Sequence, residues 1–512
     1  MKPDSLTRSL TPGDRKALRA RGLSVGEAVR QGRLIRHPPP PVAILRPCSV
    51  GDGIERLSPS QRNRLARLGR AAAREGRFSR FIPASGAASR LFTSLLQLDR
   101  HRKESGRTVR DILRDGKYPF CAPAVRFFST LRSLPLFEPL RRCLASRGQD
   151  LSALLREGNG APILDGLFDP LGLDLARLPK ALIPFHRAGN ETRTAFEEHL
   201  VEMEAGGIRR AHFTVPPEFL PEFRRLGARR TRRRGRGGSA IRLDFSVQDP
   251  ATDTLALDSK NRWVRRAGGA LLFRPGGHGA LLRNLEAAGG DIVFIKNIDN
   301  VPVESRQARG NRWRLVLAGR LAHAQRDAAR WIAALTRAAV SEKIIRGAER
   351  FVFKTLGIQN KKDSPAERKA RLLEILNRPW RVCGMVPNAG EPGGGPFWVN
   401  GADGPSRQIL EGSQVGENQK KFLRRSTHFN PVDLVVGLKD WQGRSFPLEK
   451  FVDPNQALVS VKHFEGREIR TVEHPGLWNG GMARWNTVFV EVPAGIFHPV
   501  KTILDLLRPG HR

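Results

Sequence analysis

The chain has 512 residues, 39% of them hydrophobic and 27% charged, which is typical of a folded protein with more than one packed unit. No apolar run approaches the roughly 18 residues that a membrane-spanning helix needs, and the amino terminus lacks the apolar core of a secretory signal. We therefore expect no membrane partner. The four cysteines form no CxxC pair, so we also expect no zinc site, no disulfide framework and a cytoplasmic location.

The strongest feature of the composition is a net charge of +38, carried by 88 basic residues against 50 acidic ones. Such a chain attracts polyanions without selectivity. The densest basic run, residues 229–236, has no aromatic side chains between its arginines on which bases could stack. Two explanations stay open, a generally arginine-rich proteome and attraction of anionic substrates, and both are favoured over specific binding of nucleic acid.

Residues 1–78 are expected to form a basic helical extension, interrupted by the proline run 38–41. The segment 80–92 then passes from an apolar start through small residues to an arginine that opens a helical pattern. Small side chains let backbone N–H groups approach an anion, and the arginine adds charge, so a phosphate-binding loop is one interpretation. A tight strand-to-helix turn is an equally good one. The candidate residues are Ser85, Gly86, Ala87 and Arg90.

Residues 93–175 have helical patterns and are predicted to form an inserted helical layer. Lys180 then stands directly before an apolar run that predicts a strand. A lysine at the start of a strand is more commonly just solvated. His186, at the end of that run, is predicted to be a surface histidine.

The stretch 271–301 has the most informative layout. An apolar run ends in the turn Pro275–Gly279, a helical segment covers 280–288, and a β-branched run at 292–295 predicts a buried strand. Asp299 follows that strand. In open α/β sheets ligands collect beyond the carboxyl ends of strands, so Asp299 is the first candidate functional residue.

The remaining chain is predicted to contain helices over 318–376 and then short strands, beginning at 381–386, with turns between them. The Gly- and Pro-rich segment 391–395 is more simply explained as a turn than as a ligand loop.

Several of these motifs resemble those of the UDP-glucose pyrophosphorylase (UTP–glucose-1-phosphate uridylyltransferase) family, and they come in that family's order. The turn Pro275–Gly279 with Asp299 is similar to the family's PPGHGD and DN motifs. The carboxyl-terminal segment 497–507, FHPVKTILDLL, resembles F-x-PVKTxxDLL almost letter for letter. Weaker similarities lie at 178–183, 408–415 and 429–434. The chain as a whole resembles the bacterial family described as domain of unknown function 4301, which is similar at a distance to those pyrophosphorylases.

The resemblance implies an α/β fold of GT-A-like type, with a mixed sheet flanked by helices. The core would span 79–376 with the insertion at 93–175, and a β-rich part at 377–512 would complete the sugar-phosphate site. The implied reaction joins a nucleoside triphosphate, with UTP expected, to a sugar 1-phosphate and releases pyrophosphate. Two polyanions must meet in line, so positioning and charge neutralisation supply most of such catalysis.

The resemblance also implies roles for single residues. Mg²⁺ would be held by Asp299. The phosphates would be bound by Arg90, Lys180 and Lys501. The nucleoside pocket would be lined by Ser85, Gly86, Ala87, Gln248, Gly277, His278 and Gly279, and the sugar would contact Asn430 and Asp433.

The chain departs from the family pattern in two places. Its loop before Arg90 has one glycine where the family has several, which weakens the prediction of base recognition. Arg90 and Lys180 are separated by the predicted insertion, whereas the family keeps these motifs close together. Two alternatives therefore stay open. One is a different phosphate-ligand enzyme on the same fold, such as a glycosyltransferase or one with a non-sugar acceptor. The other is a basic nucleotide- or nucleic-acid-binding protein without catalysis.

Overall fold

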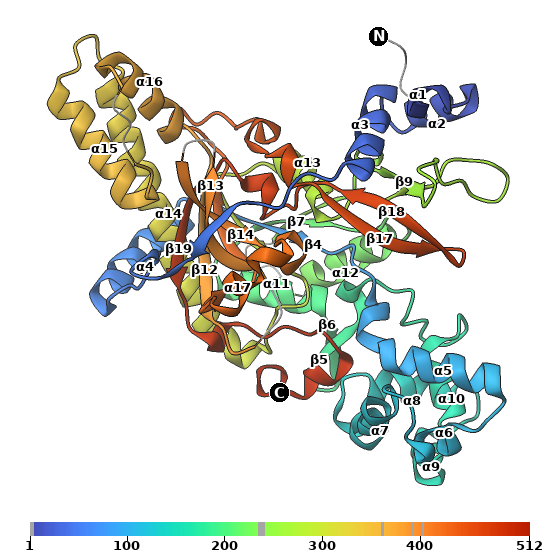
Figure 1. Ribbon diagram of the computed structural model, residues 1–512. Coiled ribbons are helices and arrows are strands. Elements are labelled where there is room, and N and C mark those ends of the chain that lie inside the picture. Colours follow the sequence, from blue (N-terminus) through green and yellow to red (C-terminus); the bar gives the residue numbers. More distant parts are fainter. Residues whose placement is uncertain (1–4, 234–240, 360–362, 391–393, 402–403) are drawn as a thin grey trace.

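The structure is a computed structural model that describes residues 5–233, 241–359, 363–390, 394–401 and 404–512 (Figure 1). The arginine run beyond Arg233 and residues 391–393 of the Gly- and Pro-rich segment lie outside these ranges. Within them, no helix combines the length and the apolar character that crossing a bilayer requires.

A ten-stranded mixed sheet forms the centre of the molecule, and helices cover it, which confirms the expected α/β class with a mixed sheet. Its strands, in spatial order, are β2 (Ser49–Val50), β3 (Gly53–Glu55), β19 (Asn486–Glu491), β12 (Trp380–Pro387), β16 (Asp433–Gly437), β11 (Ile292–Lys296), β4 (Phe78–Pro83), β7 (Arg210–Thr214) and β8 (Arg242–Ser246), with β15 (His428–Phe429) beside β12.

The direction of the strands brings the predicted site residues to one edge. Along the sheet path each neighbouring pair is parallel except at β16, which runs antiparallel to both β11 and β12. The carboxyl ends of the parallel strands therefore meet at one edge of the sheet, and β16 begins there. This is the edge at which open α/β sheets bind ligands.

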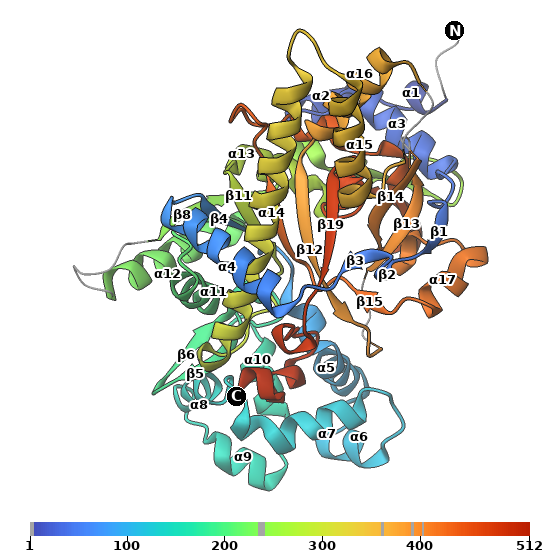
Figure 2. The ribbon, with the colours of Figure 1, turned by 90° about the vertical axis from the view of Figure 1, so that its left-hand side faces the viewer.

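Both faces of the sheet are buried, as the continuous apolar runs of its strands require. Along β11, Ile292 and Phe294 lie in the core under α14 (Gln307–Leu335), and Val293 and Ile295 pack toward α13 (Leu282–Ala288). The α14 face also carries α4 (Pro59–Arg74), α15 (Glu342–Leu356) and α16 (Pro365–Leu376) (Figure 2).

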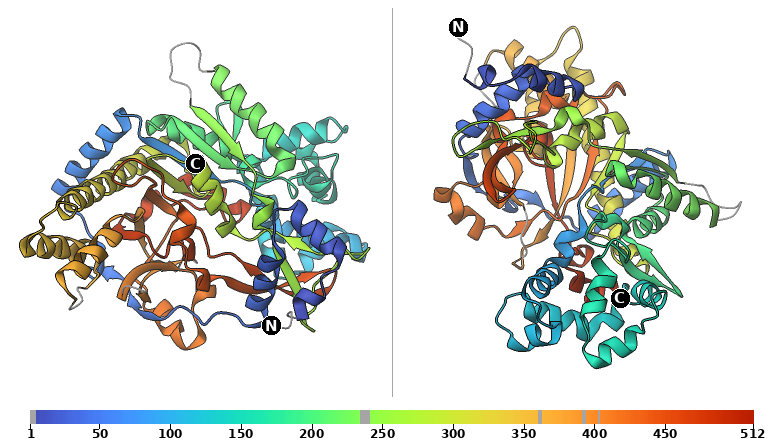
Figure 3. Two further views of the ribbon diagram at one scale, coloured as in Figure 1. Left: turned by 90° about the horizontal axis from the view of Figure 1, so that it is seen from above. Right: turned by 90° about the vertical axis from the view of Figure 1, so that its right-hand side faces the viewer.

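The predicted insertion is a lobe of short helices that projects from the sheet (Figures 1 and 3). The chain enters it after β4, and the carboxyl-terminal turns of the protein lie between the lobe and the sheet (Figure 2). The lobe consists of α5 (Thr93–Ser105), α6 (Val109–Asp115), α7 (Cys121–Thr130), α8 (Phe137–Ala145), α9 (Leu151–Glu157) and α10 (Ala161–Phe168). On leaving the lobe the chain forms β5 (Pro184–Ala188), β6 (Glu191–Thr194), α11 (Ala195–Ala205) and, after β7, α12 (Leu220–Arg233).

The amino-terminal region is less uniform than its composition predicted. The helices α1 (Ser5–Arg8), α2 (Pro12–Ala20) and α3 (Val25–Arg36) pack on a small sheet, but strands occupy parts of 44–55, and β3 extends the central sheet by pairing with β19. The two small sheets are β1 (Ile44–Pro47) with β13 (Gly395–Gly401) and β14 (Gly404–Leu410), and β10 (Phe273–Arg274) with β9 (Thr254–Asp258), β18 (Arg467–Glu473) and β17 (Leu458–Phe464).

The strand predicted directly after Lys180 is present but begins later than expected, at Pro184. Residues Lys180–Leu182 form a 3-10 turn, η3, and the strand that follows, β5, pairs with β6 in a two-stranded hairpin that is separate from the central sheet. An apolar run indicates burial rather than a particular backbone conformation, and here Leu182 and Ile183 are buried in the core beside α11. The prediction of His186 as a surface residue is wrong, because its side chain is buried and its Nε2 lies 2.9 Å from Nδ1 of His511.

Candidate active site

Three charged side chains from distant segments meet at the sheet edge. Asp299 follows β11, Lys501 follows β19, and Lys180 lies in η3. The Nζ of Lys180 is 3.0 Å from Oδ2 of Asp299, and the Nζ of Lys501 is 3.7 Å from the same oxygen. Asp299 and Lys180 are nearly buried, whereas 53% of the Lys501 side chain is exposed. The group thus presents positive charge to solvent above a carboxylate.

Backbone hydrogen bonds fix the two loops that carry this group. The N–H of Val500 donates to the carbonyl of Asp299 at 3.0 Å, and the N–H of His498 donates to Oδ1 of Asn300 at 3.0 Å. Asp505 accepts hydrogen bonds from the N–H of Lys501 at 2.8 Å. The segment that resembles F-x-PVKT is therefore tied to the Asp299 loop on one side and to its own following turn on the other.

The loop after β4 lies beside Lys180. Ser85, Gly86 and Ala87 are exposed, and a side chain at Gly86 would meet no other atom within 4 Å. The N–H of Lys180 donates to the carbonyl of Gly86 at 2.9 Å. The lobe thus returns the chain to the loop from which it left, so the loop that precedes Arg90 lies beside Lys180 although the lobe separates them in sequence. Arg90 itself is exposed in η1 (Ala88–Phe92).

The glycines of the predicted nucleoside turn have physical roles. Gly277 has a φ of +74°, which favours glycine, and a side chain at Gly279 would collide with the carbonyl of Pro475. Gln248 follows β8 at the same sheet edge and is half-buried.

The ring of His278 stacks on Trp478 with the centroids 4.2 Å apart. The N–H of Leu477 donates to its Nδ1 at 3.0 Å, so the neutral ring carries its proton on Nε2. Burial lowers the pKa of His278, which favours this neutral form. Nε2 of His278 lies 3.7 Å from Oε1 of Glu411, so this carboxylate lies beside the stacked rings of His278 and Trp478.

The two predicted sugar contacts are buried at the start of β16. Asn430 accepts a hydrogen bond from the N–H of Val432 at 3.1 Å, and among the described residues its Nδ2 has no partner. Val432 has a φ of +55°, a strained conformation for a β-branched residue. Asp433 lies 3.6 Å from Nε of Arg314, and its Oδ1 also lacks a partner among the described residues. Its role as a sugar contact stays a prediction.

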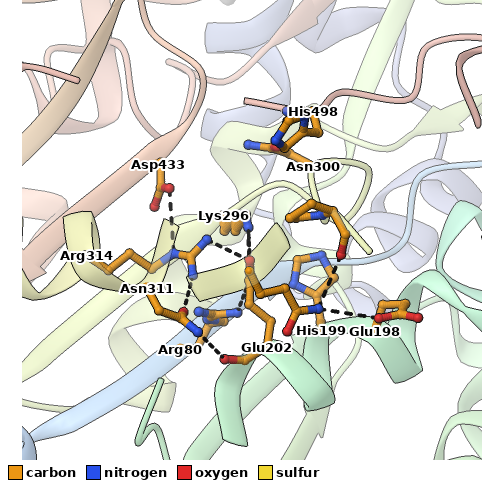
Figure 4. A network of polar contacts seen from close by, with 12 residues as sticks. Arg80, Glu198, His199, Glu202, Lys296, Asn300, Asn311, Arg314, Asp433 and His498 are labelled. Carbon is orange, nitrogen blue, oxygen red and sulfur yellow. Dashed lines mark hydrogen bonds and ion pairs between the residues drawn. The ribbon is translucent and has the colours of Figure 1, made fainter. Parts of the chain in front are cut away.

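A buried charge network lies under this edge, and the sequence did not predict it (Figure 4). Glu202 of α11 is completely buried and accepts hydrogen bonds from three cations. Arg80 donates at 2.7 Å, Lys296 at 2.8 Å and Arg314 at 2.7 Å. With Asp433, the network holds three cations and two carboxylates, so it has one positive charge in excess.

The three cations hold the pKa of Glu202 well below its usual range, against the effect of burial. Burial, with Arg314 beside it, lowers the pKa of Lys296 to about 8. Glu202 is thus ionised throughout the neutral range, and Lys296 is the member of the network that loses its proton most readily.

His199, one turn before Glu202, connects the network to the Asp299 loop. Its Nε2 donates to the carbonyl of Ile298 at 3.0 Å, and burial keeps its pKa well below the usual value. A neutral His199 therefore holds the residue that precedes Asp299 (Figure 4).

One sequence signal pointed toward this network. Arg80 and Lys296 each stand inside or at the end of an apolar strand, FSRFIP and IVFIK. A cation in a buried strand requires a carboxylate partner. Nothing in the sequence of α11 distinguishes Glu202 from its other glutamates.

A divalent cation fits the site only in part. Mg²⁺ is usually held by one or two carboxylates together with substrate phosphates, and Asp299 offers one carboxylate. Among the described residues there is no group of three or more His, Cys, Asp or Glu side chains placed to hold a metal. The donor set therefore suits an ion that arrives with a phosphate ligand rather than a resident metal.

The family model described as Domain of unknown function (DUF4301) matches residues 11–512. No curated protein matches the sequence. Among solved structures, the uridine diphosphate N-acetylglucosamine pyrophosphorylase of Trypanosoma brucei is 12% identical with a TM-score of 0.48, over 98% of this chain and 80% of that one.

Two further solved structures are similar over less of their length. The UDP-glucose pyrophosphorylase of Leishmania major is 14% identical with a TM-score of 0.36, over 64% of this chain and 61% of that one. The UDP-glucose phosphorylase of T. brucei is 13% identical with a TM-score of 0.36, over 64% and 60%. These values describe distant similarity, so the functional argument rests on the site itself.

Proposed function

We propose, on the premise that the chain belongs to the DUF4301 family, that it is a nucleotidyltransferase. It joins a nucleoside triphosphate, UTP in the first instance, to a sugar 1-phosphate and releases pyrophosphate. The fold would be of GT-A-like type, and the location the cytoplasm, where four free thiols are expected to persist.

The observation that carries the proposal is that Lys180 and Lys501 both place their Nζ within 4 Å of the same carboxylate oxygen of Asp299. They come from three segments and lie at the edge where α/β sheets bind ligands. A lone carboxylate would need one cation for balance. Two lysines at one carboxylate leave positive charge for an anion of higher charge, as a triphosphate is.

In this proposal each group of site residues binds a different part of the two substrates. Lys180 and Arg90 bind the triphosphate, and Lys501 stabilises the charge that develops on the phosphate under attack. The exposed Ser85–Ala87 loop lies against the phosphates with its backbone N–H groups. His278 and its turn, with Gln248, bind the nucleoside, and Asn430 and Asp433 face the sugar.

Asp299 would hold Mg²⁺ that accompanies the triphosphate, and the bound ion would neutralise phosphate charge. The phosphoryl oxygen of the sugar phosphate attacks the α-phosphorus, the bond to the β-phosphate oxygen breaks, and pyrophosphate leaves. No covalent link to the protein and no oxidant are needed.

The test is pyrophosphate release by the wild type and by Asp299→Asn and Lys501→Ala, with Lys343→Ala on the exposed side of α15 as the matched control. We expect each site variant to lose about 100-fold or more in turnover, by analogy with the loss of a single group that stabilises transition-state charge. The control should keep wild-type turnover. Site variants as active as the control would contradict the assigned roles.

A further inference from the structure

A cavity of about 480 Å³ lies where the helical lobe meets the carboxyl-terminal turns. Its walls come from η1 and the start of α5, from α7, and from η15 (Ile503–Leu507) with the residues beside it. Figure 2 shows these carboxyl-terminal turns between the lobe and the sheet. The cavity therefore exists only because this chain has the insertion.

Three arginines from three different segments line the cavity: Arg90 of η1, Arg126 of α7 and Arg508 beyond η15. All three are exposed. Arg508 is paired with Asp505 at 2.9 Å. In the described part of the chain, the side chains of Arg90 and Arg126 make no hydrogen bond or ion pair, so two guanidinium groups are available to an anion.

The acidic residue in the wall does not cancel this charge. The Oδ2 of Asp505 accepts from the N–H of Lys501 at 2.8 Å and from the N–H of Thr502 at 2.7 Å, and its Oδ1 meets Arg508. Its carboxylate is thus fully engaged inside the turn. The same turn carries Lys501, one residue before the cavity wall begins at Thr502.

The rest of the lining suits a small, strongly charged group. Thr93 and Thr502 are exposed, and their hydroxyls donate to the carbonyl of Arg90 and to Oδ2 of Asp505. Buried apolar side chains such as Leu95 and Phe127 also line the cavity. A guanidinium group binds phosphate oxygens in pairs, and an apolar floor that excludes water strengthens each such contact. A sugar or a base would leave both free arginines without charge partners.

We propose that this cavity binds a diphosphate group, and that the helical lobe supplies Arg126 as one of its ligands. The diphosphate is either the outgoing pyrophosphate or the outer phosphates of the bound triphosphate, and this part of the proposal rests on the proposed function. Arg126 is a binding residue on α7 of the lobe, so the lobe contributes directly to the phosphate end of the site.

The experiment is calorimetric titration of the full-length protein with inorganic pyrophosphate, with inorganic phosphate as the weaker anion. Arg126→Ala and Arg126→Lys are compared with Arg147→Ala, which removes the same charge from an exposed position of the lobe outside the cavity. Loss of a charge-assisted contact predicts that Arg126→Ala weakens pyrophosphate binding by about tenfold. We expect Arg126→Lys to recover part of this loss and Arg147→Ala to leave binding unchanged.

A second titration with UTP separates the two sources of the diphosphate. Weaker binding of both ligands in Arg126→Ala would assign the cavity to the outer phosphates of the triphosphate, and weaker binding of pyrophosphate alone would assign it to the product. Equal weakening by Arg147→Ala, no weakening by Arg126→Ala, or no pyrophosphate binding to the wild type would each overturn the proposal. Pyrophosphate binding that depends on Arg126 in a protein without any turnover would leave this inference standing and refute the proposed function.

Discussion

The buried carboxylate of Glu202 gives the sharpest test of the energetics of this fold. We consider Glu202→Gln, which keeps the shape of the side chain and removes its charge. In the wild type, Glu202 is 0% exposed and accepts hydrogen bonds from Arg80, Lys296 and Arg314. After the substitution, three buried cations share only the carboxylate of Asp433, which is 3.6 Å from Arg314.

Removal of one partner from a buried ion pair costs about 3–5 kcal/mol, because the remaining charge is desolvated and uncompensated. Deprotonation of Lys296, whose pKa is already lowered to about 8, relieves part of this cost. We therefore expect Glu202→Gln to reduce the free energy of unfolding by about 3 kcal/mol, measured by urea denaturation with tryptophan fluorescence.

The matched control is Glu222→Gln on α12, where the Glu222–Arg225 pair is exposed and its loss should cost less than about 1 kcal/mol. In the Glu202→Gln background, Arg314→Met should cost less than it does in the wild type, because it removes an uncompensated cation. A loss for Glu202→Gln no larger than that for Glu222→Gln, or additive costs in the double variant, would refute the reasoning.

Two further predictions concern stability. Burial and the neighbouring histidines lower the pKa of His511 to about 3. The unfolded chain, with a histidine pKa of about 6.5, therefore binds a proton that the folded chain does not, and stability falls as the pH drops below 6.5. At pH 5 this effect lowers the free energy of unfolding by about 2 kcal/mol. The Tm of His511→Gln should therefore fall less between pH 7 and pH 5 than the Tm of the wild type or of the exposed-site control His37→Gln. An equal fall in all three proteins would contradict a lowered pKa of His511. In the α4–α14 contact, a side chain at Gly319 would collide with the carbonyl of Leu65, so Gly319→Ala should lower the free energy of unfolding by about 1–3 kcal/mol in urea denaturation. Gly26→Ala, where the nearest atom would lie at 3.7 Å, should change it by less than about 1 kcal/mol, and similar effects of the two substitutions would count against close packing of these helices.

Much of the fold could be predicted because its signals are local. The apolar run at 292–295 and the helical spacing at 280–288 gave β11 and α13 nearly to the residue. The layout of a strand followed by Asp299 also predicted that this residue lies beyond the carboxyl end of a strand of the central sheet. The meeting of Lys180 and Lys501 with Asp299 followed from a resemblance in motif order, since no local pattern joins residues so far apart.

The errors have a common physical cause, which is that burial depends on partners remote in sequence. The run after Lys180 was predicted to be a strand throughout because it is apolar, but tertiary packing on α11 places Lys180–Leu182 in a 3-10 turn. The sequence of α11 does not single out Glu202, yet three cations from β4, β11 and α14 converge on it. The cavity at Arg126 could not be predicted either, because its walls come from three separate segments.

The central claim is that Lys180, Lys501 and Asp299 form a site that transfers a nucleotidyl group to a sugar phosphate. The most direct measurement is pyrophosphate release with Mg²⁺ and UTP or another nucleoside triphosphate, with and without a panel of sugar 1-phosphates. The account predicts release that requires one triphosphate and one sugar 1-phosphate together and that is lost in Lys501→Ala. Release with the triphosphate alone, or no release across the panel from protein that binds the triphosphate, would contradict it.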